Sequence, residues 1–549
     1  MKRLVLVQIV LLMVTISLYS INLFSQESFY TYDDALGPIS KNPMIIFAVV
    51  LFIVFSILVL YSLGNSFSYY SAIIAILPLL LKYLMPSIAQ TSYITNFYDA
   101  SGHMVRGAYV VVTGHTDPGV DGYFDLQPGF FWWTGIYVNI VWGPQNNYLA
   151  PPFIFLMKYY SIILLVLAIP ILIQLFRKLG LSLSQSFFAF FVFVMISITR
   201  YHYSAQAYTY LLFWLAIEIL ATKNFDIRSI VMLVLLFAST VFLHQGTTLY
   251  MLIAVFSLII FSLCGKSLLR EKGYSKLIYI FLLTSSIWLS RLMYMTVYTF
   301  KNFVDTLEAV IQTILRESTY IVQKSLLRSY PLWQTIVLYK AVFYIGMVVT
   351  LFLILLYRIW RARDKKSGLL FSISAGLVIL LSPIALSLGG AGYIERVYDI
   401  LTPLMAFSFL SLMNNAAKAR KERYFITPLA MFLIIFASIS GFIFYFSGRN
   451  FQSLLYSEVY IHNFFVGYGP NIASIYSKLN IQPILQLDYL NITLERGVLY
   501  SYAWHQDIEL LYYKFGDIEI LNHIKTVLIL NTDLLYNSKT TMAFYNSYL

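Results

Sequence analysis

The sequence predicts an all-α polytopic membrane protein with about thirteen transmembrane helices, a large external loop and a small C-terminal extracytoplasmic α/β domain. Three observations predict this fold class. Of the 549 residues, 59% are hydrophobic and 11% are charged. Apolar runs of about twenty residues, the length of helix that crosses a hydrocarbon core, recur through the first 446 residues. Lys and Arg gather in short segments between these runs.

The apolar runs define a transmembrane domain over residues 1–446, followed by a C-terminal domain over 447–549. Spans are expected near 4–24, 43–64, 70–87, 153–176, 183–199, 205–222, 229–244, 247–264, 277–299, 336–357, 368–388, 398–413 and 424–446. The first span follows a basic start and has no small-residue cleavage site behind it, so it is expected to remain as an anchor.

Basic residues in alternate loops predict the orientation of the chain. The basic loops contain Arg177 and Lys178, Lys223 and Arg228, Lys266 to Lys276, Arg358 to Lys366, and Lys418 to Arg423. Because cytoplasmic loops carry the excess of Lys and Arg, the N-terminus is expected in the cytoplasm and the C-terminus outside the cell. The protein is therefore expected to be a multi-pass protein of the cell membrane.

The net charge of +12 and the single cysteine exclude several other classes. The cations lie in short loops and not along one solvated face, so nucleic acid is not expected as a partner. Membrane lipids are expected as partners. A single cysteine, Cys264, excludes an internal disulfide and a Cys-rich metal site.

The expected external loop, residues 88–152, collects charged residues between two apolar regions. Read as a helix, Asp99, His103 and Arg106 lie on one face, which is expected to meet water. The opposite face is expected to lie in lipid and carries Phe97, Met104, Val105, Ala108, Val111 and Val112. Gly114 is placed to end this helix. The residues after it are expected in loops, with solvated carboxylates or metal-binding oxygens at Asp117, Asp121 and Asp125.

Two further regions are expected outside the membrane. Segment 302–328 has apolar residues at helical spacing and predicts a second interfacial helix. Residues 447–549 are mixed polar and aromatic with short alternating runs such as 525–536, which favour a small α/β domain. A glycosylation sequon begins at Asn491 in that domain.

The run YDASGHMVRGAYVVVTG followed by YFDLQPGFFWW resembles the first large external loop of the GT-C superfamily of membrane glycosyltransferases. Archaeal multi-span families and, more distantly, the oligosaccharyltransferase catalytic subunit are the most similar in pattern. Weaker similarities are Tyr203 to Gln206, His244 to Thr247, and Glu395 with Arg396. The WWDYG signature of oligosaccharyltransferases does not occur in the chain, so the acceptor is left open as a glycan, a protein or a lipid.

The resemblance implies transfer of a sugar from a polyprenyl-phosphate-linked donor on the external leaflet. Asp99 would be the acidic residue of the family, acting as a base or, with His103, as a ligand of a divalent metal such as Mg or Mn. Arg106, Arg291 and Arg396 would hold the donor phosphate. The paired acids Asp33 and Asp34 are the rival position for the acidic motif.

Two other functions are compatible with the same residues. The charges would line a pathway in a transporter or flippase of a lipid-linked or polar substrate. A non-catalytic GT-C-like scaffold protein would also retain them. Transporters usually show internal repeats with paired broken spans, and the sequence shows no such repeat, which favours the enzyme.

Overall fold

The structure is a computed structural model, and it describes the backbone of residues 2–24, 43–84, 92–95, 98–117, 123–143, 151–198, 201–222, 226–264, 274–294, 331–362, 365–387, 391–418, 420–446, 453–455, 474–477 and 526–529. The acids Asp33, Asp34 and Asp121, the expected interfacial helix at 302–328 and most of 447–549 lie outside these residues.

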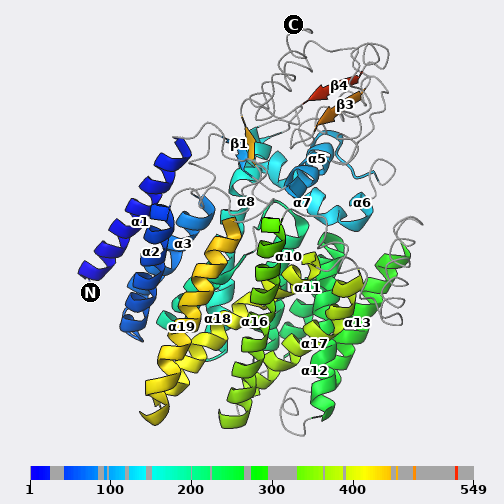
Figure 1. Ribbon diagram of the computed structural model, residues 1–549. Coiled ribbons are helices and arrows are strands. Elements are labelled where there is room, and N and C mark those ends of the chain that lie inside the picture. Colours follow the sequence, from blue (N-terminus) through cyan, green and yellow to red (C-terminus); the bar gives the residue numbers. More distant parts are fainter. Residues whose placement is uncertain are drawn as a thin grey trace.

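Apolar helices make up the body of the protein (Figure 1). They are α1 (Lys2–Phe24), α2 (Pro43–Leu63), α3 (Ser68–Leu79) with the π-helical turn η2 (Leu80–Leu84), α8 (Pro151–Lys178), α9 (Leu183–Ile196), α10 (Ala205–Leu220), α11 (Ile227–Leu243), α12 (Gln245–Cys264), α13 (Tyr274–Met293), α16 (Pro331–Ala362), α17 (Lys365–Ser387), α18 (Ala391–Lys418) and α19 (Arg420–Phe446). Within the described residues, seven helices are long and apolar enough to cross a membrane, and six further apolar helices are shorter. The chain is thus a helical integral membrane protein, and the count of thirteen spans remains a prediction.

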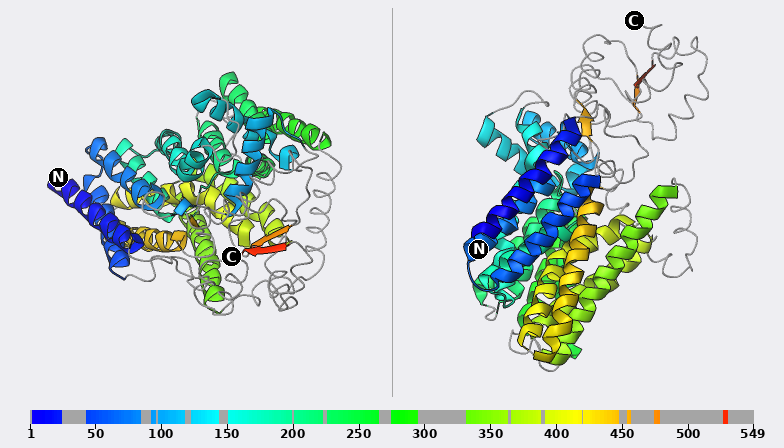
Figure 2. Two further views of the ribbon diagram at one scale, coloured as in Figure 1. Left: turned by 90° about the horizontal axis from the view of Figure 1, so that it is seen from above. Right: turned by 60° about the vertical axis from the view of Figure 1, so that its left-hand side comes forward.

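Helices α9 and α18 form the centre of the bundle. Helix α9 packs on α3, α8, α18 and α19, and α18 packs also on α16 and α17. In the most apolar stretch of α18, 94% of the residues are buried, against 22% in α13 at the edge. Helices α1 and α2 lie side by side along one flank (Figure 2). A central helix buried on every side has no lipid-facing stripe, so polar groups on it need partners within the protein.

Helix α5 (Tyr98–Thr113) has the extent that the sequence predicts. Gly114 follows it at φ 77°, and its N–H donates to the carbonyl of Val110 at 2.8 Å, so the predicted stop is confirmed. The expectation that its apolar face lies in lipid is wrong for Met104, Ala108 and Val111. They are buried within the protein at 1%, 0% and 7% exposure, because α7 packs on α5, whereas Val112 is 38% exposed.

Helix α7 (Pro128–Trp142), preceded by the short α6 (Tyr123–Leu126), replaces part of the loop expected after α5. Helix α7 carries large apolar side chains on more than one face. One face packs on α5, and another exposes Trp132, Ile136 and Ile140 at 45%, 60% and 77%. Such a face is typical of a helix in contact with lipid. The larger exposed apolar face of this segment is therefore on α7.

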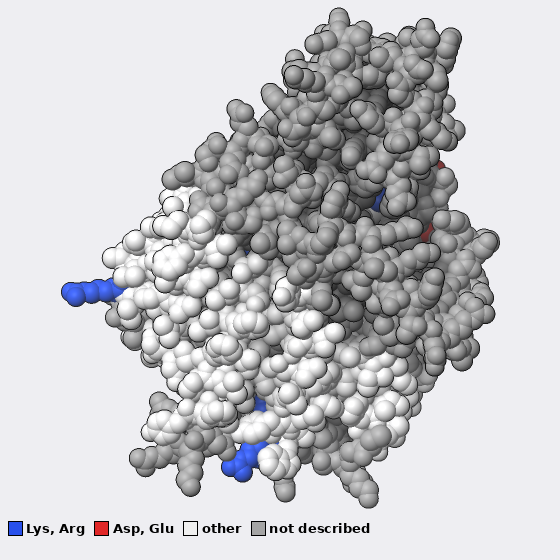
Figure 3. Space-filling view, viewed as in Figure 1, with Lys and Arg blue, Asp and Glu red and all other residues white. Residues whose placement is uncertain are grey.

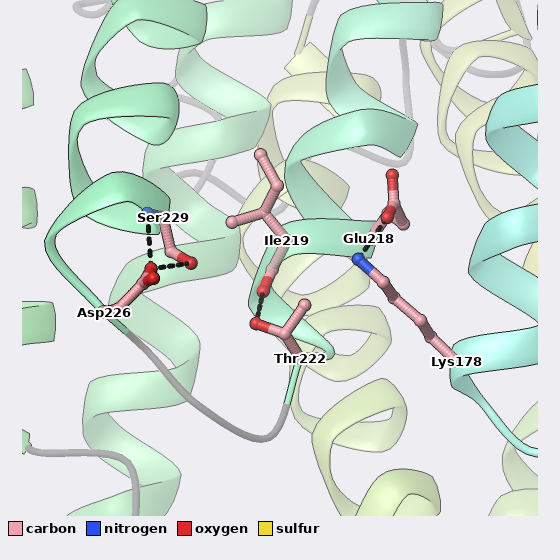
Figure 4. A network of polar contacts seen from close by, with 6 residues as sticks. All are labelled: Lys178, Glu218, Ile219, Thr222, Asp226 and Ser229. Atoms are coloured by element: carbon pink, nitrogen blue, oxygen red, sulfur yellow. Dashed lines mark hydrogen bonds and ion pairs between the residues drawn. The ribbon is translucent and has the colours of Figure 1, made fainter.

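Helices α5, α6 and α7 lie across one end of the bundle, here named the α5 end (Figure 1). The other end carries basic groups that the sequence assigned to alternate loops. There Lys178 pairs with Glu218, Lys366 donates to the carbonyl of Lys178, and Asp226 caps α11 by accepting from the N–H and hydroxyl of Ser229 at 2.9 and 2.8 Å (Figure 4). On the face in Figure 3, the larger blue areas lie at the left edge and the lower end, and the red lies at the upper right.

Short strands connect the α5 end to the C-terminal region. Strand β1 (Ser92–Thr95), just before α5, pairs antiparallel with β2 (Ser453–Leu455), just after α19. Strand β3 (Ser474–Ser477) pairs in parallel with β4 (Thr526–Ile529), which falls in the alternating run at 525–536. The C-terminal α/β domain remains a prediction.

Candidate functional site

The predicted acidic residue Asp99 lies in the first turn of α5, where its backbone is helical; its side chain is outside the described part of the structure. One turn later, His103 is 4% exposed, with its ring 6.0 Å from that of Phe130 and 6.1 Å from that of Phe131. The expected water-facing position of His103 is therefore wrong, because α7 packs over it. Arg106, a further turn along, is half-buried.

Arg291 connects the end of α13 to α6. Its guanidinium donates to the backbone carbonyl of Asp125 and lies 5.8 Å from the centre of the Phe242 ring. Asp125 is 8% exposed, although the sequence predicted a solvated loop acid. Arg291 therefore holds protein atoms at the α5 end.

Asp117 follows α5 and is half-buried. Burial, and then the nearby Asp117 carboxylate, raise the pKa of Tyr109 on the last turns of α5, because both disfavour a phenolate. Tyr109 therefore stays neutral and acts as a packing group beside His115 and Phe124.

The three weakly matching segments of the sequence meet at the α5 end. At the start of α10, the Gln206 side chain donates to the Tyr210 hydroxyl. Tyr210 is within electrostatic reach of Arg396 and Asp399 on α18, and of Tyr250 on α12. Arg396 is half-buried, and Asp399 is 8% exposed. A cation, a carboxylate and hydrogen-bonding hydroxyls are thus gathered where these three helices begin.

His244 belongs to the same neighbourhood. Its Nδ1 lies 2.9 Å from the hydroxyl of Thr247, which in turn lies 2.8 Å from the hydroxyl of Thr209 on α10. The predicted tight turn from His244 to Thr247 is therefore bonded to the helix that carries Gln206 and Tyr210. These contacts give His244 a positioning role.

Sequence reasoning missed a buried lysine in the bundle. Lys82, in η2, is 0% exposed, and its amino group donates to the carbonyls of Val194 and Met195. The signal was present, because Lys82 stands inside the span expected at 70–87. An ionisable residue inside a span is by default functional or tightly paired.

The predicted metal site was tested against the side chains present. Among those that the structure describes, no three His, Cys, Asp or Glu residues are grouped so as to hold a metal ion. His103 packs against the rings of Phe130 and Phe131, so the described side chains do not by themselves fit a divalent metal. The site at Asp99 and His103 stays a prediction.

Comparisons with known proteins give matches among solved structures alone. No protein-family model matches the chain, and no curated protein matches it. The apo oligosaccharyltransferase from Archaeoglobus fulgidus matches 74% of this chain and 58% of its own, with 10% identity and a TM-score of 0.48. The archaeal oligosaccharyltransferase AglB from Archaeoglobus fulgidus, in complex with an inhibitory peptide and a dolichol-phosphate, matches 74% of this chain over 58% of its own length, with 11% identity and a TM-score of 0.49. The complex of the Archaeoglobus fulgidus enzyme with Zn and sulfate matches 73% of this chain over 56% of its own length, with 11% identity and a TM-score of 0.45.

The chain spans a little over half the length of the archaeal structures that it matches. With TM-scores below 0.5, this likeness carries neither substrates nor residue roles to the chain. The function is therefore inferred from the residues of the chain itself.

Proposed function

We propose that the protein is a membrane glycosyltransferase that takes a sugar from a polyprenyl-phosphate-linked donor. The observation that supports it most is the gathering of polar groups at the α5 end, where Arg396, Tyr210, Gln206 and Asp399 lie at the heads of apolar helices. A lipid-linked donor keeps its chain in the bilayer and its phosphate at the surface. A cation at the head of a membrane helix is suited to that phosphate.

Each residue has a distinct role in this proposal. As the acceptor oxygen or nitrogen attacks the anomeric carbon, the bond from that carbon to the phosphate oxygen breaks, and the lipid phosphate leaves with the bonding electrons. Asp99 takes the acceptor proton. Arg396 stabilises the charge on the leaving phosphate. Arg106 and Arg291 are the other cations that could hold the donor phosphate.

The orientation belongs to the same proposal. Lys178 and Lys366 lie at the end opposite α5, and cytoplasmic segments carry the excess of basic residues. The α5 end, the donor and the acceptor would then be outside the cell, and the N-terminus inside.

The test compares Asp99→Asn with Asp33→Asn in membranes that contain equal amounts of protein. Transfer is followed from radiolabelled polyprenyl-phosphate sugars to endogenous acceptors. We expect Asp99→Asn to lose about a hundredfold or more of the activity, the usual size of a general-base effect, and Asp33→Asn to stay near the parent. If Asp33→Asn abolishes transfer and Asp99→Asn spares it, the acidic motif lies in the earlier loop. If no donor supports transfer by the parent, the enzyme proposal is wrong.

Two further experiments test the role of Arg396 and the role of Asp99 separately. Arg396→Lys keeps the charge and loses the planar pair of donors, so we expect a raised KM for the donor with a smaller change in kcat. EDTA distinguishes the two roles open to Asp99, since a base works without a metal and a metal ligand does not.

A further inference from the structure

Helix α9 ends inside the bundle. It has 14 residues, Leu183–Ile196, and begins at the end opposite α5 with a capping box between Ser182 and Gln185. At about 1.5 Å per residue it rises roughly 21 Å, less than the hydrocarbon core of about 30 Å. The carbonyls of its last turn have no partners within the helix, and in an apolar surrounding such groups require other donors.

Lys82 provides most of these donors. Its ammonium donates to the carbonyls of Val194 at 3.0 Å, Met195 at 3.3 Å and Ser197. A cation also complements the negative end of a helix dipole. Lys82 sits in the π-helical turn η2, and such turns occur often at functional sites.

Groups from two other helices complete the arrangement. The hydroxyl of Tyr398 donates to the carbonyl of Ile196 at 2.9 Å, and the ring of Tyr445 lies 4.9 Å from the Lys82 ammonium. Parts of η2, α18 and α19 thus converge on the end of α9.

Residues that follow the end of α9 contact α5 and α7. The hydroxyl of Ser197 lies 3.2 Å from that of Tyr201, which is buried and has a left-handed backbone at φ 40°. This conformation is uncommon for a bulky residue and persists where the surroundings enforce it. Two residues later, the Tyr203 hydroxyl bonds to that of Thr134 on α7 and lies against Gly107 on α5.

We propose that Lys82 is a positioning residue, which holds the end of α9 and thereby sets where Tyr203 meets α5 and α7. Without the Lys82 amino group, three carbonyls lose their donor, so the end of α9 opens. The consequence for sugar transfer rests on the function proposed above. The consequence for the end of α9 does not.

The structural test uses the full chain with Cys264→Ser as a cysteine-free background. Ala205→Cys, at a position 1% exposed at the start of α10, reports opening, and Ala168→Cys, at a position 0% exposed on α8, is the control site. The rate of labelling by a membrane-permeant maleimide is measured in each. We expect Lys82→Met to raise the rate at 205 by about tenfold and leave the rate at 168 unchanged, as for local opening.

Lys340→Met, which removes another buried ammonium from α16, is the matched control and should change neither rate. An unchanged rate at 205 in Lys82→Met overturns the proposal, as does an equal rise at both sites. If Lys82→Met does not accumulate, Tyr398→Phe removes a donor at the same helix end without changing charge. It should raise the rate at 205 alone, and an unchanged rate again overturns the proposal.

Activity gives the second readout. Lys82→Met should lower kcat for transfer and leave the donor KM unchanged, since Arg396 is untouched, and Lys82→Arg should recover part of kcat. An unchanged kcat would overturn the link to catalysis. If the parent transfers no sugar, the function proposed above is wrong, and the labelling rates alone decide the role of Lys82.

Discussion

Gly441 on α19 provides a direct test of the packing at the end of α9. A Cβ atom at this position would lie 2.6 Å from the carbonyl oxygen of Met195 and 2.7 Å from the Cα of Ile196. Both are backbone atoms of a buried helix end, so no side chain can move aside. The shortest distance is about 0.8 Å below the 3.4 Å at which ordinary contact begins. Gly441→Ala must therefore displace α19 or the last turn of α9.

The expected magnitude follows from a comparison with Gly346 on α16, whose added Cβ would meet nothing within 4 Å. Gly346→Ala should stabilise the protein by up to about 1 kcal/mol through helix propensity. Gly441→Ala gains the same propensity and loses about 1–3 kcal/mol to overpacking, with a further loss where Met195 moves away from Lys82.

The assay is the temperature at which half of the detergent-solubilised protein leaves the monodisperse peak in size-exclusion chromatography. We expect the midpoint of Gly441→Ala to fall several degrees below that of Gly346→Ala, with the parent between them. A midpoint for Gly441→Ala equal to or above that of Gly346→Ala would refute the close contact between α19 and α9.

Three further predictions follow from particular contacts. Gly107→Ala places a Cβ 2.9 Å from the Tyr203 hydroxyl, so it should cost about 1–3 kcal/mol in the same assay. Gly135→Ala, whose nearest atom is at 3.3 Å, is the milder control, and equal losses would contradict the Gly107 contact. In a Cys264→Ser background, His115→Cys should react with an impermeant maleimide on intact cells and Arg361→Cys only after permeabilisation; external labelling of both would reverse the orientation. The hydrogen bonds from Ser229 lower the pKa of Asp226 in the folded protein. The cap on α11 is therefore complete above the pKa that Asp226 has in the unfolded chain, and it is lost as pH falls through the lowered pKa of the folded protein. Protection of the Ser229 amide from hydrogen exchange, relative to an unstructured amide at the same pH, should fall over that acidic range, and Asp226→Asn should abolish this fall.

The helices themselves follow from local sequence. Each expected span coincides with a described helix, for instance 183–199 with Leu183–Ile196 and 424–446 with Arg420–Phe446. An apolar run in a membrane must satisfy its backbone internally, so its composition is enough to predict a helix. The stop of α5 at Gly114 is equally local, because it depends on one residue that tolerates a positive φ.

The sequence alone therefore determined the membrane class, the approximate positions of the long apolar helices, the extent of α5 with Asp99 in its first turn, and the segments that carry charge. The tertiary structure decided what each face and each buried charge meets. Periodicity shows that α5 has an apolar face, but whether lipid or α7 covers it depends on packing between segments. For the same reason, Lys82 and the carbonyl of Val194, 112 positions apart in the sequence, are recognised as partners only after folding. A lysine is tolerated in an apolar bundle because the carbonyls of a helix end accept its hydrogen bonds, and no local pattern encodes that arrangement.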